Sequence, residues 1–149
     1  MLALKPAEIE YEMLTIPKGT NGIIQPLDVL CFGQYMDFFR KICNWILVNG
    51  EPVQVRPRDV VLRLHSLTYR QFCSPRFENL ITEAWHKCGY TDHHVKYITP
   101  AEFCFKDLAG TCYHEDCKNS VLLVCGWCKG RLCFEHFFVA YHNCFLYLP

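Results

Sequence analysis

The sequence predicts an α-rich α+β fold that ends in a small cysteine-rich module. Three observations support this: a helical apolar pattern over residues 26–48, helix-start signals at residues 74–75 and 99–102, and six of the eleven cysteines within residues 109–149. Apolar residues make up 51% of the 149 residues, which is typical of a globular chain and not of a disordered one. The net charge is zero, so binding to nucleic acid would need a local basic patch.

The first predicted zone, residues 1–48, contains a strand, a turn and a long helix. Residues 10–16 alternate loosely in polarity, which favours a strand, and residues 17–22 favour a turn. Pro26 suits the first turn of a helix, where no backbone donor is needed. The helix that follows has one apolar face, at spacings of three and four, formed by Val29, Phe32, Met36, Phe39, Cys43 and Ile46.

The second predicted zone, residues 49–108, is helical. One helix covers residues 57–72. Another begins with Ser74 as its N-cap and ends at Gly89, a typical C-terminal cap. Thr99 and Glu102 form a capping box that opens a short helix. The third zone, residues 109–149, follows this helix and begins at a boundary near Gly110.

The compartment predicted from the sequence is intracellular. No apolar run approaches the roughly 18–20 residues that span a bilayer, and the first residues lack the layout of a signal peptide. In a reducing compartment, eleven cysteines are expected to be metal ligands or small buried apolar residues and not disulfides.

The tail carries eight candidate metal ligands in the order C-x4-C-x7-C-x2-C-x4-C-x2-H-x5-H-x-C. They are Cys112, Cys117, Cys125, Cys128, Cys133, His136, His142 and Cys144. A CxxC turn aims two sulfurs at one ion, and eight ligands complete two closed, structural zinc sites. The interleaved order of the ligands predicts a cross-brace. A 41-residue tail cannot bury a sufficient core alone, so we expect metal binding to supply much of its folding free energy.

The predicted pairing places four ligands on each zinc ion. Cys112, Cys117, Cys133 and His136 would hold one ion, and Cys125, Cys128, His142 and Cys144 the other. His114 lies between the first two cysteines and is an alternative to one of the outer ligands. Trp127, Phe137 and Phe138 are expected to form the core of the module. The other five cysteines are expected in the core: Cys31, Cys43, Cys73, Cys88 and Cys104.

Residues 14–40 resemble the end of the catalytic domain of pogo-like and mariner-like DDE transposases. The resemblance rests on a strand, a turn and Gln25-Pro26-Leu27-Asp28 opening an amphipathic helix. It implies an RNase H-like origin for residues 1–48 and makes Asp28 the third acid of the catalytic site. In such enzymes, carboxylates hold two divalent ions, Mg²⁺ or Mn²⁺, that activate water and stabilise the leaving oxygen. The local chemistry alone favours the interpretation of Asp28 as a helix-start residue, and the surrounding motif favours the transposase ancestry.

The chain alone is not expected to be an active endonuclease. Before Asp28 it offers only Glu8, Glu10 and Glu12, all at one presumed strand, whereas the site needs acids from two separate strands. We therefore expect a catalytically incomplete, C-terminal piece of a transposase-derived protein. Mg²⁺ or Mn²⁺ would bind only if the catalytic domain were complete.

The tail resembles the cysteine-rich C-terminal domains of piggyBac-group transposases and, more distantly, B-box and RING cross-braces. In the piggyBac group this domain contacts DNA, which implies DNA as a partner here and a nuclear location. A row of arginines is the other candidate contact: Arg56, Arg63 and Arg70 are seven residues apart, so they approach one helix face that could meet phosphates. The alternatives are an ordinary solvated helix face and a zinc-dependent protein-interaction module with no DNA role.

Overall fold

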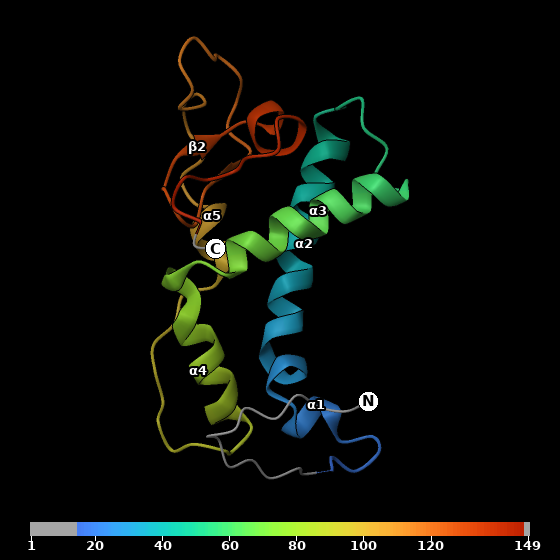
Figure 1. Cartoon of the computed structure of the whole chain (residues 1–149), viewed down its shortest axis with the longest axis vertical. Coiled ribbons are helices and arrows are strands. Elements are labelled where there is room, and N and C mark those ends of the chain that lie inside the picture. Colours follow the sequence, from blue (N-terminus) through green and yellow to red (C-terminus); the bar gives the residue numbers. More distant parts are fainter. Residues whose placement is uncertain (1–14, 148–149) are drawn as a thin grey trace, which may run out of the picture.

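The computed structural model describes residues 15–147 and confirms the α-rich class. Its helical segments and strands are α1 (Asn21–Ile24), η1 (Leu27–Cys31), α2 (Phe32–Val48), α3 (Arg58–Phe72), η2 (Pro75–Phe77), α4 (Glu78–Lys87), α5 (Pro100–Cys104), β1 (Leu123–Val124), β2 (Arg131–Leu132) and η3 (Glu135–Val139). In Figure 1, α2 follows the long axis of the molecule, α3 crosses it, and α4 lies toward the end that holds α1. The strand predicted at residues 10–16 falls mainly outside the described residues, and Thr15 and Ile16 have no regular structure.

The long helix predicted at residues 26–48 is present, and its predicted apolar face is confirmed in part. Ile46 is buried and Phe39 and Cys43 pack against the core, whereas Phe32 and Met36, in the first turns of α2, are 50% and 39% exposed. The helix also buries Phe38 and Ile42, which the predicted face did not include. Before α2, the chain forms η1, a π-helical turn that carries Val29.

The next two helices begin and end close to the predicted positions. Gly89 has a φ of 76°, and its N–H bonds the carbonyl of His86, as expected of a C-terminal cap. Ser74 is the N-cap residue before Pro75, as predicted, but its side chain makes no capping hydrogen bond. Its hydroxyl instead donates to the carbonyl of Gly126 in the tail, at 2.9 Å. Ser74 thus joins two parts of the chain 52 residues apart.

The capping box at the start of α5 is confirmed. The backbone N–H of Glu102 donates to the Thr99 hydroxyl at 3.1 Å, and the Thr99 N–H donates to the Glu102 carboxylate at 2.9 Å. The bonds that the Thr99 N–H and hydroxyl donate to the carboxylate lower the pKa of Glu102 below its usual value. The cap fixes the helix that carries Cys104, whose side chain is fully buried.

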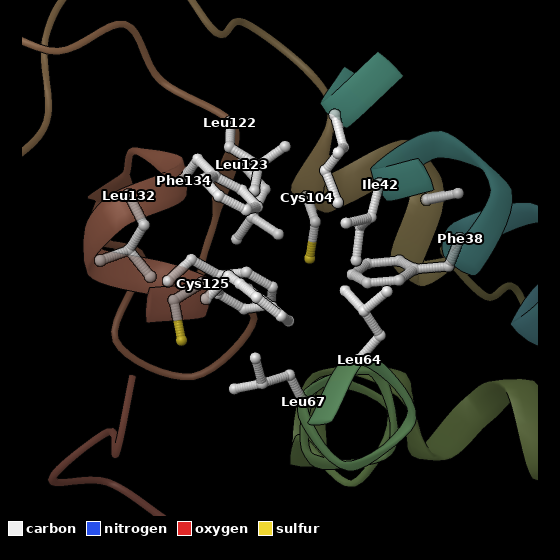
Figure 2. Close-up of a cluster of buried hydrophobic side chains, with 14 of the residues drawn as sticks. Phe38, Ile42, Leu64, Leu67, Cys104, Leu122, Leu123, Cys125, Leu132 and Phe134 are labelled. Carbon is white, nitrogen blue, oxygen red and sulfur yellow. The ribbon is translucent and has the colours of Figure 1, made fainter. Parts of the chain in front are cut away.

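One hydrophobic core unites the helices with the tail. Leu64 and Leu67 of α3 and Phe38 and Ile42 of α2 face Cys104 and the tail residues Leu122, Leu123, Cys125, Leu132 and Phe134 (Figure 2). Phe137 and Phe138 are buried in this core, as predicted, and Trp127 is half-buried beside it. A second, smaller cluster joins Leu30 and Cys31 to Leu80 and Ala84 of α4. All three predicted zones contribute to the main core, and the zone boundaries stay a prediction.

The five cysteines assigned to the core differ in their environment. Cys31 and Cys104 are buried, and burial raises the pKa of both thiols. Cys43 and Cys88 are half-buried. Cys73 is exposed, so the prediction is wrong for it, because it follows the last turn of α3 where the chain leaves the core. Within residues 15–147, no helix is both long enough and apolar enough to cross a bilayer.

Candidate metal centre

The tail brings its cysteines and histidines together in two groups of four. The first cluster consists of Cys112, Cys117, Cys133 and His136, and the second consists of Cys125, Cys128, His142 and Cys144. Within each cluster, the candidate ligand atoms lie within 4.8 Å of one another. The two groups alternate along the chain, so the chain crosses from one cluster to the other. This is the arrangement that the ligand spacing predicts.

A tight turn after β1 positions the two thiols of Cys125 and Cys128. The N–H of Cys125 bonds the carbonyl of Gly130 at 2.9 Å, and the N–H of Lys129 bonds the carbonyl of Cys125 at 3.0 Å. The Gly130 N–H points at the Cys128 sulfur, at 3.4 Å. A β-carbon at Gly130 would lie 3.0 Å from the Tyr113 ring and 3.2 Å from that sulfur. The hairpin of β1 and β2, which pairs Leu123 with Leu132 and Val124 with Arg131, therefore ends in a turn shaped around the thiols.

The first cluster is assembled from two loops and the start of η3. An isolated bridge between Thr111 and Ser120 closes the loop that carries the first two cysteines. Cys133 and His136 lie where β2 passes into η3, and the N–H of Phe137 bonds the carbonyl of Cys133. This helical turn places the histidine ring beside the sulfur that precedes it by three residues.

The distances within the first cluster are close to those of tetrahedral zinc coordination, and the distance given for the second cluster is longer. With Zn–S of about 2.3 Å and Zn–N of about 2.0–2.1 Å, tetrahedral ligands lie about 3.8 Å apart for two sulfurs and about 3.5 Å apart for sulfur and nitrogen. The Cys117 and Cys133 sulfurs are 3.8 Å apart. The His136 Nδ1 atom lies 3.4 Å from the Cys112 sulfur and 3.2 Å from the Cys133 sulfur. In the second cluster, the Cys128 sulfur lies 3.9 Å from His142 Nε2.

Each cluster contains a thiol whose pKa is raised. Burial, with hydrogen bonds to Cys112 and Cys117, raises the pKa of Cys133 to about 11. A hydrogen bond with Cys125, together with burial, raises the pKa of Cys128 to about 11, while the same bond lowers the pKa of Cys125. A divalent ion would displace these protons, since the thiolate is the form that binds metal.

The second cluster is anchored to the helices through the backbone of Gly126. Its N–H donates to the Gln71 side-chain oxygen at 2.7 Å, and its carbonyl accepts from Ser74 and from Arg76, at 2.9 and 3.0 Å. The Trp127 ring N–H adds a bond to the carbonyl of Arg70 at 2.7 Å. The helical region thus holds the CxxC turn mainly by its main chain, and the Gln71 side-chain N–H also approaches the Cys125 sulfur, at 3.8 Å.

The anchoring residues were missed from the sequence, although one signal was available. Leu64, Leu67 and Gln71 share one face of α3, and all three are fully buried. A polar residue that continues an apolar stripe indicates a buried hydrogen bond, because such a group is costly to bury alone. The partner in the tail could not be inferred from residues 57–72 alone.

His114, the alternative ligand, lies outside both clusters. Its ring stacks on that of His136, with centroids 3.9 Å apart and planes inclined by 16°. Burial and the neighbouring histidines lower its pKa. Its place in this structure is against the ring of a candidate ligand.

The three arginines of the predicted row have different surroundings: Arg63 and Arg70 bond tail residues, whereas Arg56 makes no such bond among the described residues. Arg56 is exposed in the connection before α3. Arg63 donates to the carbonyl of Val139 at 3.2 Å, and its guanidinium lies 5.6 Å from the Phe138 ring centroid. Arg70 donates to the side chain of Asn143 at 2.7 Å and lies 5.0 Å from the centre of the Tyr147 ring. Two members of the row therefore also fasten the tail to α3.

Asp28 is half-buried in the first turn of η1. Among the described residues, none of the groups of three or more Cys, His, Asp or Glu side chains that could hold a metal includes it. The acids Glu8, Glu10 and Glu12 lie outside residues 15–147. The position of Asp28 therefore agrees with both of its sequence interpretations, a helix-start residue and a third catalytic acid.

Residues 85–144 match the family model of the Tc5 transposase C-terminal domain. This match supports a transposase-derived protein. The matched segment begins near the end of α4, well before the boundary predicted at residue 109, and ends at Cys144. It contains all eight residues of the two clusters and also α5, which packs against β1. No curated protein and no solved structure matches the chain.

Proposed function

We propose that this chain is a catalytically incomplete, transposase-derived protein that binds duplex DNA and whose tail is held by two structural zinc ions. The observation that carries the proposal is the coincidence of two findings. The segment that matches the Tc5 transposase C-terminal domain is also the segment in which eight Cys and His side chains form two clusters of four candidate metal ligands.

Zinc is the metal that best suits these clusters. Each offers three sulfurs and one imidazole nitrogen. Such soft, four-membered sets favour Zn²⁺ over Mg²⁺ or Ca²⁺, which prefer oxygen ligands. Because each set is complete, the ions would stabilise the fold and would not activate water.

Arg56 and Arg63 are the proposed phosphate contacts. Both are exposed, and Arg63 lies where α3 meets η3. Arg70 is half-buried between α3 and the tail, so its proposed part in DNA binding is to position that surface. Because the chain has no net charge, such binding would depend on this local patch and would be sensitive to salt.

Catalysis lies outside the proposal. Residues 1–48 would derive from the end of an RNase H-like domain, with Asp28 as its third acid. The described residues provide no second carboxylate that forms a metal-binding group with it. A protein with this ancestry and a DNA-binding role is expected in the nucleus.

The test is duplex DNA binding by the zinc-loaded full chain, measured by fluorescence anisotropy over a salt series. The Arg56→Glu variant is expected to weaken binding and to reduce the slope of log affinity against log salt by about one. Lys18→Glu, at the exposed turn before α1, makes the same charge change away from α3 and serves as the control. Affinity and slope that are equal in all three proteins would contradict the DNA proposal.

A protein-interaction role without DNA is the second candidate. It is favoured by Phe145 and Leu146, which directly follow the second cluster and are 82% and 44% exposed. In this case the zinc-loaded chain would show no salt-dependent DNA binding. A Phe145→Ser variant would then lose a protein partner and keep both zinc ions.

A further inference from the structure

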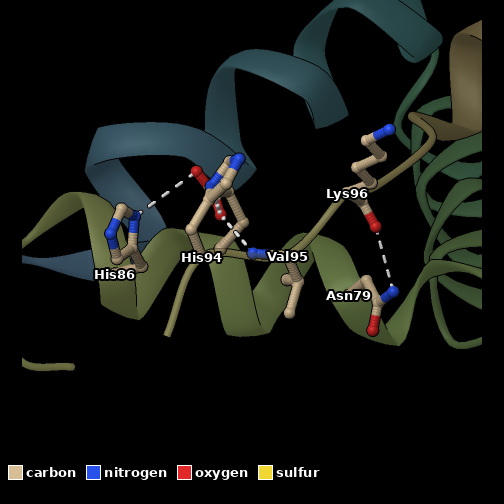
Figure 3. A network of polar contacts seen from close by, with 6 residues as sticks. Asn79, His86, His94, Val95 and Lys96 are labelled. Atoms are coloured by element: carbon tan, nitrogen blue, oxygen red, sulfur yellow. Dashed lines mark hydrogen bonds and ion pairs between the residues drawn. The ribbon is translucent and has the colours of Figure 1, made fainter. Parts of the chain in front are cut away.

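A third group of metal-binding side chains lies away from both tail clusters, against α4. It consists of Glu83 and His86, one helical turn apart on α4, and His94 from residues 88–99, the α4–α5 connection. Their candidate ligand atoms lie within 4.8 Å of one another. In Figure 3, His86 and His94 lie side by side and the connection runs along the helix.

The separations in this group suit a small ion. The His94 Nδ1 atom lies 2.8 Å from one carboxylate oxygen of Glu83, and the His86 Nδ1 atom lies 3.6 Å from the other. Nitrogen and oxygen ligands at about 2.0–2.1 Å from a tetrahedral zinc ion are about 3.3 Å apart. The two distances, each to a different carboxylate oxygen, lie on either side of that value.

His86 supplies an independent observation. Its Nδ1 atom is buried from solvent and has no hydrogen-bond partner among the described residues. The 3.6 Å to Glu83 is too long for a hydrogen bond. A buried polar atom without a partner is unfavourable, and in native proteins it often marks a missing ion or water. This nitrogen points at the carboxylate with which it would share a metal.

The carboxylate of Glu83 is buried. Its side chain is 3% exposed and accepts a hydrogen bond from the Val95 N–H at 3.1 Å. Its ion-pair partners among the described residues are two histidines, with no Lys or Arg. Buried charged groups in proteins are paired or coordinate metals, so this carboxylate is a favourable position for a cation.

We propose that Glu83, His86 and His94 bind one zinc ion, with a fourth position open to water. Two imidazoles and a carboxylate form a known three-ligand zinc set, whereas Mg²⁺ and Ca²⁺ select oxygen ligands. The side chain of His94 is 65% exposed, which gives an ion access from solvent. The ion would fasten the connection to α4, where Asn79 already holds the carbonyl of Lys96 at 3.0 Å (Figure 3).

Metal stoichiometry of the full chain tests the proposal. Native mass spectrometry with excess zinc is expected to show three ions per chain, the third lost first to a weak chelator because it has only three protein ligands. His94→Ala is expected to bind two ions. His93→Ala removes the adjacent exposed histidine, which lies outside the group, and is expected to bind three. Glu83→Gln keeps the side-chain shape and is also expected to lose the third ion.

Two results would overturn the proposal. One is a wild-type chain that never binds more zinc than His94→Ala. The other is a third ion that survives in both His94→Ala and Glu83→Gln.

Absorption spectra of the chain with Co²⁺ distinguish metal binding at Glu83, His86 and His94 from metal binding at the two tail clusters. Co²⁺ in the tail clusters would show thiolate-to-metal charge-transfer absorption, whereas Co²⁺ at Glu83, His86 and His94 would show only weak ligand-field bands. If one equivalent of Co²⁺ binds without charge-transfer absorption, and this binding is lost in His94→Ala, the third site is supported even when the tail binds no metal. If charge-transfer absorption increases over the first two equivalents of Co²⁺ and no more Co²⁺ binds, the tail sites are supported and the third site is refuted.

Discussion

At the scale of single residues, Gly126 shows how closely the tail approaches the helices. A β-carbon there would lie 2.9 Å from the Phe77 ring and 3.3 Å from the Gln71 side-chain oxygen. Phe77 is 2% exposed, so its ring has little room to move. The glycine is therefore required by the space around it, and its backbone groups are used for anchoring.

We expect Gly126→Ala to destabilise the zinc-loaded chain by about 1–3 kcal/mol, because the added methyl group forces the CxxC turn away from Phe77. Urea unfolding measures the change. Gly33→Ala is the matched control: Gly33 lies in α2 and has open space where the added methyl group would lie, so about 0.5–1 kcal/mol of stabilisation is expected from its better helix propensity. Equal effects of the two substitutions would show that the turn is not tightly packed.

At the scale of elements, helix positions could be predicted from the sequence more readily than helix faces. Capping residues act locally, so Thr99, Glu102 and Gly89 marked helix ends correctly. The buried face of α2 depends on partners distant in sequence, which its own pattern of apolar residues does not identify. Ser74 illustrates the same limit, because its hydroxyl bonds the tail and leaves the nearby helix start uncapped.

The two tail clusters were the part of the candidate site that could best be predicted from the sequence. Ligand spacing alone indicated which four residues would share a cluster, because a tight turn fixes the direction of both its sulfurs. The group at Glu83, His86 and His94 gave no such signal. Its third member comes from an irregular connection whose path is set by hydrogen bonds to α4. Only tertiary structure brings these three side chains together.

The capping box of α5 supports a prediction at this scale. Thr99→Ala is expected to cost about 1 kcal/mol of unfolding free energy, because it removes the acceptor for the Glu102 N–H. Since the folded pKa of Glu102 is lowered, its stabilisation is present above its unfolded pKa of about 4.3 and is lost only below it. The cost should therefore be constant between about pH 5.5 and pH 7.5.

Denaturant unfolding at several pH values within that window measures this cost. Thr91→Ala, at an exposed position in the α4–α5 connection, is the control and should have no effect. A cost for Thr99→Ala that falls steeply within the window would contradict the assignment to an ionised Glu102.

At the scale of the whole molecule, the shared core couples the metal clusters to the helices. Leu64 and Leu67 of α3 pack in the same core as Leu122, Leu132 and Phe137 of the tail. If the tail holds the two proposed zinc ions, their removal should unfold it and expose one side of that core. The smaller cluster around Leu30 and Leu80 includes no residue of the tail.

We therefore expect a strong chelator to reduce hydrogen-exchange protection in α3 as well as in the tail. The backbone amides of Leu64 and Leu67 should lose protection, whereas that of Leu30 should lose much less. Hydrogen exchange with mass spectrometry, with and without chelator, measures both regions in one sample. Protection of α3 that is unchanged after the tail has opened would show that the two parts fold independently.

The unequal burial of the two clusters has a consequence for the timing of metal exchange. Three of the four side chains in the second cluster are buried, including Cys125, which is fully enclosed, whereas His136 and Cys117 of the first cluster are half-exposed. An ion at the first cluster can leave through a local fluctuation of its loops, but an ion at the second leaves only when the core opens. The residence time of the second ion would thus report the lifetime of the folded state itself.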